Sequence, residues 1–162
     1  DPGIGVGRII GEVCHFIDYL TFLNGSLPEK LSAVALKDVD NLNDTINISL
    51  QFKNGSVGVI CYYANGSKKL PKEYIEVFSL GTTFVLNDFK ELKIFGSNGV
   101  TKKKLLNQNK GQKEMVTEFI ETLLSGGDSL IEFDEIVSVT RSTFRVLESI
   151  KNNGKLINVS GV

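Results

Sequence analysis

Two periodicities divide the chain. From residue 8 to residue 23 the apolar side chains recur every three or four positions, which predicts an amphipathic helix. From residue 32 onward they alternate with polar ones, the pattern of half-buried strands, most clearly in 45–52 (TINISLQF) and 57–63. Asn54-Gly55 between these two strands favours a two-residue hairpin loop. In that register four pairs face one another on one side of the sheet: Phe52 with Val57, Leu50 with Val59, Ile48 with Cys61, and Ile46 with Tyr63.

The rest of the chain supplies further strands and two more helices. The strands are expected within 32–39, 73–80, 82–88, 90–96, 97–106 and 155–159. One helix is expected over 112–124, with its segment TEFIETLL in the core, and another from Asp134 as N-cap to a stop at Gly154. This order predicts an α+β fold, an open, mainly antiparallel sheet with helices packed on one face.

The other face of that sheet is expected to be half apolar. Its expected residues include Ser49, Ile60 and Tyr62. An open face of this kind is often a subunit interface, and simple exposure to solvent is the alternative.

Length and charge narrow the function classes. The chain has 162 residues, which fits a single domain over 1–162, and its formal net charge of −1 argues against a nucleic-acid or anionic-membrane partner. Its apolar runs are too short to cross a bilayer. Cys14 and Cys61 lack metal-ligand spacing and are expected to be reduced packing residues of a cytoplasmic protein.

The first residues, DPGIGVG, include no initiator methionine, and Met115 is the only methionine. We therefore expect the chain to be part of a longer protein. The glycines do not predict a dinucleotide-binding loop, because such a loop follows directly on a strand.

The predicted first helix carries the chemistry. Arg8, Glu12 and His15 are four and three residues apart, so they can touch on one side of a helix, and Tyr19 continues the row. A histidine beside a carboxylate is suited to proton transfer. One histidine and one glutamate supply too few ligands for a metal. The alternative is a surface ion pair next to a structural histidine.

Three segments resemble a known family: GRIIGEVCHFIDYLTFLNGS, LPKEYIEVFSLGTTFVLNDFKELKIFG and LIEFDEIVSVTRSTFRVLESI. Together they are similar to the C-terminal domain of the glucose–fructose oxidoreductase / inositol dehydrogenase (Gfo/Idh/MocA) family. The resemblance implies a glyceraldehyde-3-phosphate-dehydrogenase-like open sheet that forms the substrate wall and the homodimer interface. It also implies an oxidoreductase that uses NAD or NADP on a sugar or nucleotide-sugar hydroxyl or carbonyl. The nucleotide and the catalytic lysine belong to an N-terminal Rossmann domain that is absent here, so this fragment alone is expected to be inactive.

The resemblance also assigns roles to residues. His15 matches the catalytic histidine, and Asp18 matches a structural aspartate. Gly11 stands where the family has another aspartate, and Glu12 is expected to take over its catalytic part. Arg8 and Tyr19 are expected to contact substrate, Arg8 through an acidic or phosphorylated group. The alternative is a non-catalytic dimerisation or ligand-binding module, which the glycine at position 11 favours.

Overall fold

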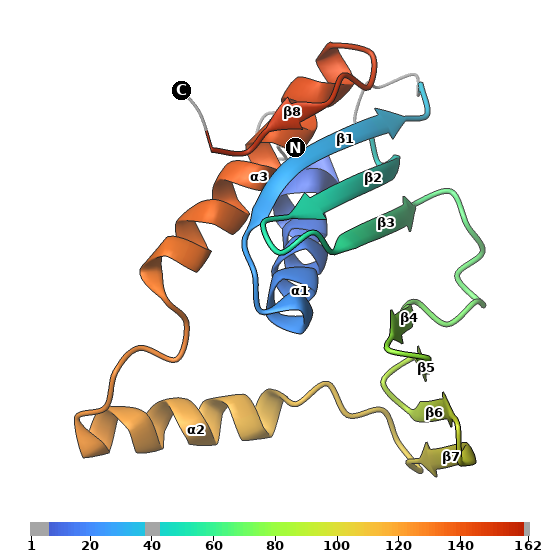
Figure 1. The fold of residues 1–162 in the computed structure, drawn as a ribbon, viewed down its shortest axis with the longest axis vertical. Coiled ribbons are helices and arrows are strands. Elements are labelled where there is room, and N and C mark those ends of the chain that lie inside the picture. The colour runs from blue at the N-terminus through green and yellow to red at the C-terminus, as the bar shows by residue number, and fades with distance from the viewer. Residues whose placement is uncertain (1–6, 38–42, 161–162) are drawn as a thin grey trace. The chain divides into compact units, whose positions relative to one another are not determined.

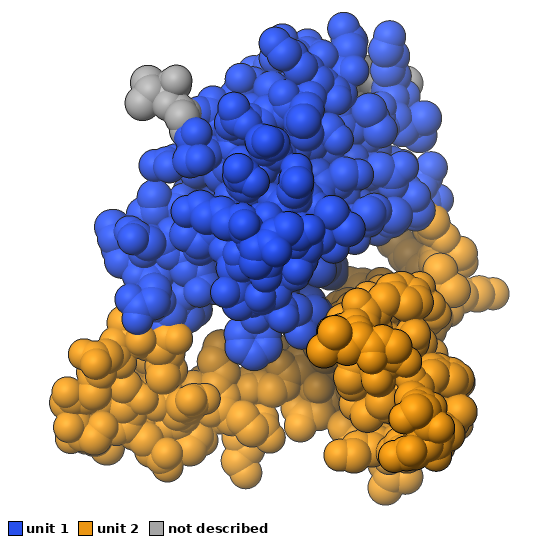
Figure 2. Space-filling model, in the orientation of Figure 1, with its two compact units in different colours: residues 1–65, 131–162 blue, residues 66–130 orange. Residues whose placement is uncertain are grey.

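A computed structural model describes residues 7–37 and 43–160 of the chain. It divides into two units, one made of Asp1–Asn65 with Ile131–Val162 and the other of Gly66–Leu130 (Figure 2). Most of the glycine-rich lead-in DPGIGVG and the end of the strand expected over 32–39 lie outside the described residues.

The first unit is built on a four-stranded antiparallel sheet in the order β3-β2-β1-β8. Its strands are β1 (Pro28–Ala35), β2 (Thr45–Phe52), β3 (Val57–Tyr63) and β8 (Ile157–Asn158). The prediction for β2 is confirmed at both ends, and β8 closes the sheet beside β1 as expected. β1 begins four residues earlier than the alternation indicated, because its pairing with β2 extends back to Pro28, opposite Phe52.

Helices cover one face of this sheet. The first runs through the π-helix η1 (Ile9–Val13) into α1 (Cys14–Asn24), and α3 (Phe133–Lys151) lies against α1 and β1 (Figure 1). The buried apolar core lies between these helices and the sheet and includes Ile9, Val13, Ile17, Leu31, Ile46, Ile48, Phe52 and Val146. The predicted α+β class, with helices on one face of an open antiparallel sheet, is confirmed. α3 begins one residue before Asp134, so Glu132 and not Asp134 occupies the N-cap position.

The predicted hairpin register is wrong by one residue. Ile46 pairs with Tyr62, Ile48 with Ile60, and Leu50 with Gly58. The N–H of Gly55 donates to the carbonyl of Phe52, and Gly55 has φ +85°, so the loop is a tight turn followed by a left-handed glycine rather than a two-residue turn. The extra residue moves every side chain of β3 to the opposite face.

The shift changes the composition of both faces. Ile60 is buried and Tyr62 lies on the helix-covered side, so the expectation that they belong to the open face is wrong. The open face instead carries Val57, Val59 and Tyr63 of β3, which are 76%, 64% and 54% exposed. Serine and asparagine residues of β2 lie between them and β1.

The second unit has its own antiparallel sheet. β4 (Tyr74–Ser79), β5 (Thr82–Asn87), β6 (Glu91–Gly96) and β7 (Gly99–Lys104) follow one another in chain order. The four strands were expected from the sequence, but they form a separate sheet.

The helix α2 (Gln112–Ser125) also belongs to the second unit; it extends one residue beyond the expected range 112–124 and is followed by a left-handed Gly126. It contains no buried residue, and Phe119 and Leu123 are 55% and 64% exposed. The expectation that TEFIETLL is core is therefore wrong: periodicity identifies an apolar helix face but not what covers it.

Candidate functional site

The helix that carries His15 begins with a wide turn. The buried residues Ile9, Val13, Ile17 and Thr21 are spaced by four, whereas a regular α-helix averages 3.6 residues per turn. The π-helical segment over Ile9–Val13 contains the extra residue, and such wide turns occur frequently at functional sites. As a result Thr21 is buried, whereas Leu23, which a uniform helix would place in the core, is 40% exposed.

Arg8, Glu12 and Tyr62 form a closed set of hydrogen bonds at this wide turn. Arg8 Nη1 lies 3.3 Å from Glu12 Oε1 and donates to the Tyr62 hydroxyl at 3.2 Å. The Tyr62 hydroxyl in turn donates to Glu12 Oε2 at 2.6 Å. Burial and the hydrogen bond to Glu12 raise the pKa of Tyr62, so its hydroxyl stays protonated and keeps the Glu12 carboxylate in place.

Asp44, directly before β2, completes the cluster. Its Oδ1 accepts the backbone N–H of Arg8 at 3.0 Å, and its Oδ2 lies 3.6 Å from Arg8 Nε. One carboxylate thus binds both the first turn of the helix and the side chain that projects from it. Hydrogen bonding to Tyr62, and the charges of Glu12 and Asp44, raise the pKa of Arg8 and keep the guanidinium charged.

His15 is exposed on the same helix, one turn after Glu12. Its Nδ1 lies 3.0 Å from the backbone carbonyl oxygen of Glu12. A carbonyl can only accept, so Nδ1 carries the proton, and in the neutral ring Nε2 holds the lone pair. His15 therefore contacts the main chain of Glu12, whereas the Glu12 carboxylate accepts hydrogen bonds from Arg8 and Tyr62.

The other residues singled out from the sequence lie along this helix. Gly11 is exposed, and a Cβ added there would meet no atom within 4 Å, so packing does not require a glycine. Asp18 and Tyr19 are half-buried on α1. Burial raises the pKa of the Tyr19 hydroxyl, which keeps it a hydrogen-bond donor at neutral pH.

Sequence reasoning missed Tyr62 and Asp44. Both lie far from the helix along the chain, 54 and 36 residues from Arg8, so no local spacing connects them to it. The correct hairpin register would have found Tyr62, because it places that side chain on the helix-covered face. Gly55 was the residue that could have indicated that register, because a glycine at this position allows the left-handed residue that follows the turn.

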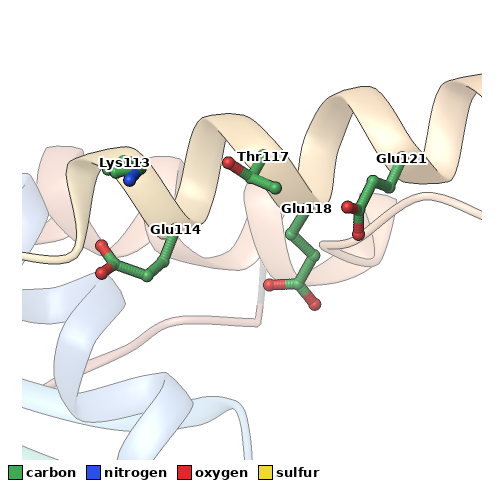
Figure 3. Close-up of a pocket in the computed structure, with 5 residues that line it drawn as sticks. All are labelled: Lys113, Glu114, Thr117, Glu118 and Glu121. Atoms are coloured by element: carbon green, nitrogen blue, oxygen red, sulfur yellow. The ribbon is translucent and has the colours of Figure 1, made fainter.

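The second unit has a different polar surface. A pocket of about 570 Å³ is lined by side chains of α2 alone: Lys113, Glu114, Thr117, Glu118 and Glu121 (Figure 3). A row of carboxylates on one helix face is ordinary solvated surface and supplies no convergent set of ligands.

No group of three or more histidine, cysteine or acidic side chains is placed to hold a metal ion within 7–37 and 43–160. In the same part of the chain, no helix has the length and hydropathy to cross a membrane.

Comparison with known proteins identifies the fold. No family model and no curated protein matches the sequence. Solved structures do match. An oxidoreductase from Agrobacterium radiobacter in complex with NAD+, L-tartaric acid and magnesium superposes with a TM-score of 0.74 and 18% identity over 91% of this chain and 48% of its own. UDP-N-acetylglucosamine 3-dehydrogenase from Acidithiobacillus ferrooxidans superposes with a TM-score of 0.79 and 14% identity, over 92% of this chain and 49% of its own. A dehydrogenase from Clostridium difficile superposes with a TM-score of 0.76 and 18% identity, over 88% of this chain and 48% of its own.

The chain spans about half the length of these structures. The fold that the resemblance implied is therefore confirmed: this chain shares it with about half of each of these oxidoreductase and dehydrogenase structures.

Proposed function

We propose that this chain is the substrate-binding and dimerisation domain of an NAD(P)-dependent oxidoreductase that acts on a sugar or nucleotide-sugar hydroxyl or carbonyl. The observation that carries the proposal is the exposed His15, whose Nδ1 is bonded to a main-chain carbonyl on a helix with a wide turn, in a fold shared with dehydrogenases. Its two free cysteines accord with a reducing compartment such as the cytoplasm.

In this proposal His15 handles the proton of the reacting hydroxyl. Nε2 of the neutral imidazole accepts that proton during oxidation and returns it during reduction, and the bond from Nδ1 to the Glu12 carbonyl fixes the tautomer. Arg8 and Tyr19 donate hydrogen bonds to other hydroxyls of the substrate. Glu12, held by Arg8 and Tyr62, orients this polar surface.

The nicotinamide cofactor supplies the hydride acceptor or donor when bound. The described residues are not suited to hold its pyrophosphate: none of their strands runs through a glycine-rich loop into a helix, the arrangement that binds it. The nucleotide therefore belongs to the other half that the matched structures contain.

The test is substitution of His15 in the protein joined to its nucleotide-binding half. His15→Ala is expected to lower kcat by about 10²- to 10⁴-fold, the usual contribution of a general acid–base group. Phe22→Ala, on the same helix and 73% exposed, is the matched control and is expected to leave kcat unchanged. Turnover that is indifferent to His15→Ala would contradict the catalytic role.

Gly11 allows a second test of the same site. Because space at Gly11 is open, Gly11→Asp restores the aspartate of the family without a clash. If Glu12 does the work of that aspartate, Gly11→Asp is expected to rescue a Glu12→Gln variant. A protein that turns over no sugar either with or without the aspartate would favour the non-catalytic module.

The open face of the first sheet is the proposed homodimer interface. Val57, Val59 and Tyr63 are exposed there beside serine and asparagine side chains of β2, and a half-apolar sheet face of this kind is often a subunit interface. Val59→Glu is expected to convert the dimer to a monomer in sedimentation velocity. Thr140→Glu adds the same charge on an exposed position of α3 and is expected to leave the dimer intact. Monomeric protein before substitution would refute this interface.

A further inference from the structure

The charge around Arg8 defines what the proposed substrate site can accept. Two carboxylates face its guanidinium, Glu12 at 3.3 Å and Asp44 at 3.6 Å, together with the neutral hydroxyl of Tyr62 at 3.2 Å. One positive and two negative groups leave the cluster with a formal charge of −1. The positive end of the helix dipole, about half a unit charge, offsets only part of this excess.

Both carboxylates are held by donors other than the guanidinium. Asp44 accepts the backbone N–H of Arg8 at 3.0 Å, and Glu12 accepts the Tyr62 hydroxyl at 2.6 Å. Each carboxylate is therefore held beside Arg8 by a hydrogen bond that does not involve the guanidinium. The guanidinium itself remains half exposed, with 51% of its side chain open to solvent, so it can still donate to a ligand.

We infer that Asp44 determines specificity: it compensates Arg8 so that the site takes the neutral hydroxyls of a sugar and disfavours a carboxylate or phosphate at this position. This inference rests on the proposed function and narrows its substrate class. The matched folds leave that class open, since one was crystallised with L-tartaric acid, a hydroxy acid with two carboxyl groups, and another acts on a nucleotide sugar. Arg8, already the counter-ion of Glu12 and Asp44, then donates hydrogen bonds to substrate hydroxyls, in place of the acidic or phosphorylated group that was expected from the sequence.

The experiment compares neutral sugars with their acids in the protein joined to its nucleotide-binding half. Glucose is paired with glucuronate, and N-acetylglucosamine with its uronic acid, and kcat/KM is measured with NAD+ and NADP+. The unsubstituted protein is expected to prefer the neutral member of each pair by about tenfold or more, because like charges in one site are strongly unfavourable.

Asp44→Asn is the informative variant. Its amide oxygen can still accept the Arg8 N–H, so the helix start is preserved while one negative charge is removed. The variant is expected to raise the ratio of kcat/KM for the acids to kcat/KM for the neutral sugars by about fivefold. Asp134→Asn, the same substitution in the first turn of α3, is the control and is expected to leave the ratio unchanged.

Three outcomes are distinct. An unsubstituted protein that uses the acids as well as the neutral sugars, or an Asp44→Asn variant with an unchanged ratio, overturns the inference. Absence of turnover on every compound refutes the proposed function instead. The charge selectivity is then decided by calorimetric titration of glucose and glucuronate into the same proteins, where tighter binding of glucuronate by the unsubstituted protein overturns the inference.

Discussion

Ser149 joins α3, β1 and the loop before β8 through one buried hydroxyl. Its side chain is fully buried on α3; Oγ accepts the backbone N–H of Ala33 at 2.9 Å and donates to the carbonyl of Lys155 at 2.7 Å. β8 pairs with β1 only at Lys30 and Leu31, so Ala33 lies beyond the end of that ladder. The serine replaces the strand partner that this N–H lacks.

Ser149→Ala is expected to lower the free energy of unfolding by about 2 kcal/mol. Leaving the buried Ala33 N–H without an acceptor costs about 1–3 kcal/mol, while the carbonyl of Lys155, an exposed residue, can bond to water instead. Urea unfolding followed by circular dichroism measures the difference, and hydrogen exchange of the Ala33 amide, expected to lose protection, locates it.

Ser142→Ala is the matched control. Ser142 is equally buried on the same helix, but its hydroxyl only donates to the carbonyl of Ser138 one turn earlier. Such back-bonding adds little to stability, so this variant is expected to change the unfolding free energy by less than about 0.5 kcal/mol. Equal losses in the two variants, or full protection of Ala33 in Ser149→Ala, would refute the role assigned to the hydroxyl.

Three further predictions concern the same unit. Gly154→Ala is expected to destabilise it by about 1–3 kcal/mol in urea unfolding, because Gly154 has φ +81° and an added Cβ would lie 2.8 Å from Val34 Cγ1; a neutral effect would contradict this. In the Val59→Glu variant, whose open sheet face is expected to be free of a partner copy, a thiol reagent is expected to label Cys61 faster than Cys14, since the corrected register exposes Cys61 whereas Cys14 is half-buried; the predicted two-residue loop would have buried Cys61, so protection of Cys61 in this variant would restore that register. Burial and the bond to Glu12 raise the pKa of Tyr62, so the stability contributed by its neutral form is complete below about pH 10 and is lost as pH rises through the raised value. The difference in absorbance at 295 nm between the unsubstituted protein and Tyr62→Phe is expected to titrate above pH 10, and titration below it would contradict the buried hydrogen bond.

The α+β class and nearly every element were predictable from the sequence. Side chains alternate between the two faces of a strand and return to the same face of a helix after three or four residues. Local backbone geometry sets both repeats, so they can be read from the alternation in TINISLQF and from the helical spacing that begins at residue 8. The candidate helix was found for the same reason, with Arg8 and Glu12 in contact as predicted.

Tertiary structure decided the features that depend on distant parts of the chain. The loop at Gly55 set the register of β3 and so brought Tyr62 to Glu12, and the segment before β2 brought Asp44 to Arg8. The spacing of Glu12 and His15 correctly predicted that the two residues are in contact. The Glu12 carboxylate, however, accepts the Tyr62 hydroxyl, and His15 bonds to the main-chain carbonyl of Glu12. Local sterics determine which face of an element is apolar or polar; which partner meets that face depends on packing between elements, which periodicity does not encode.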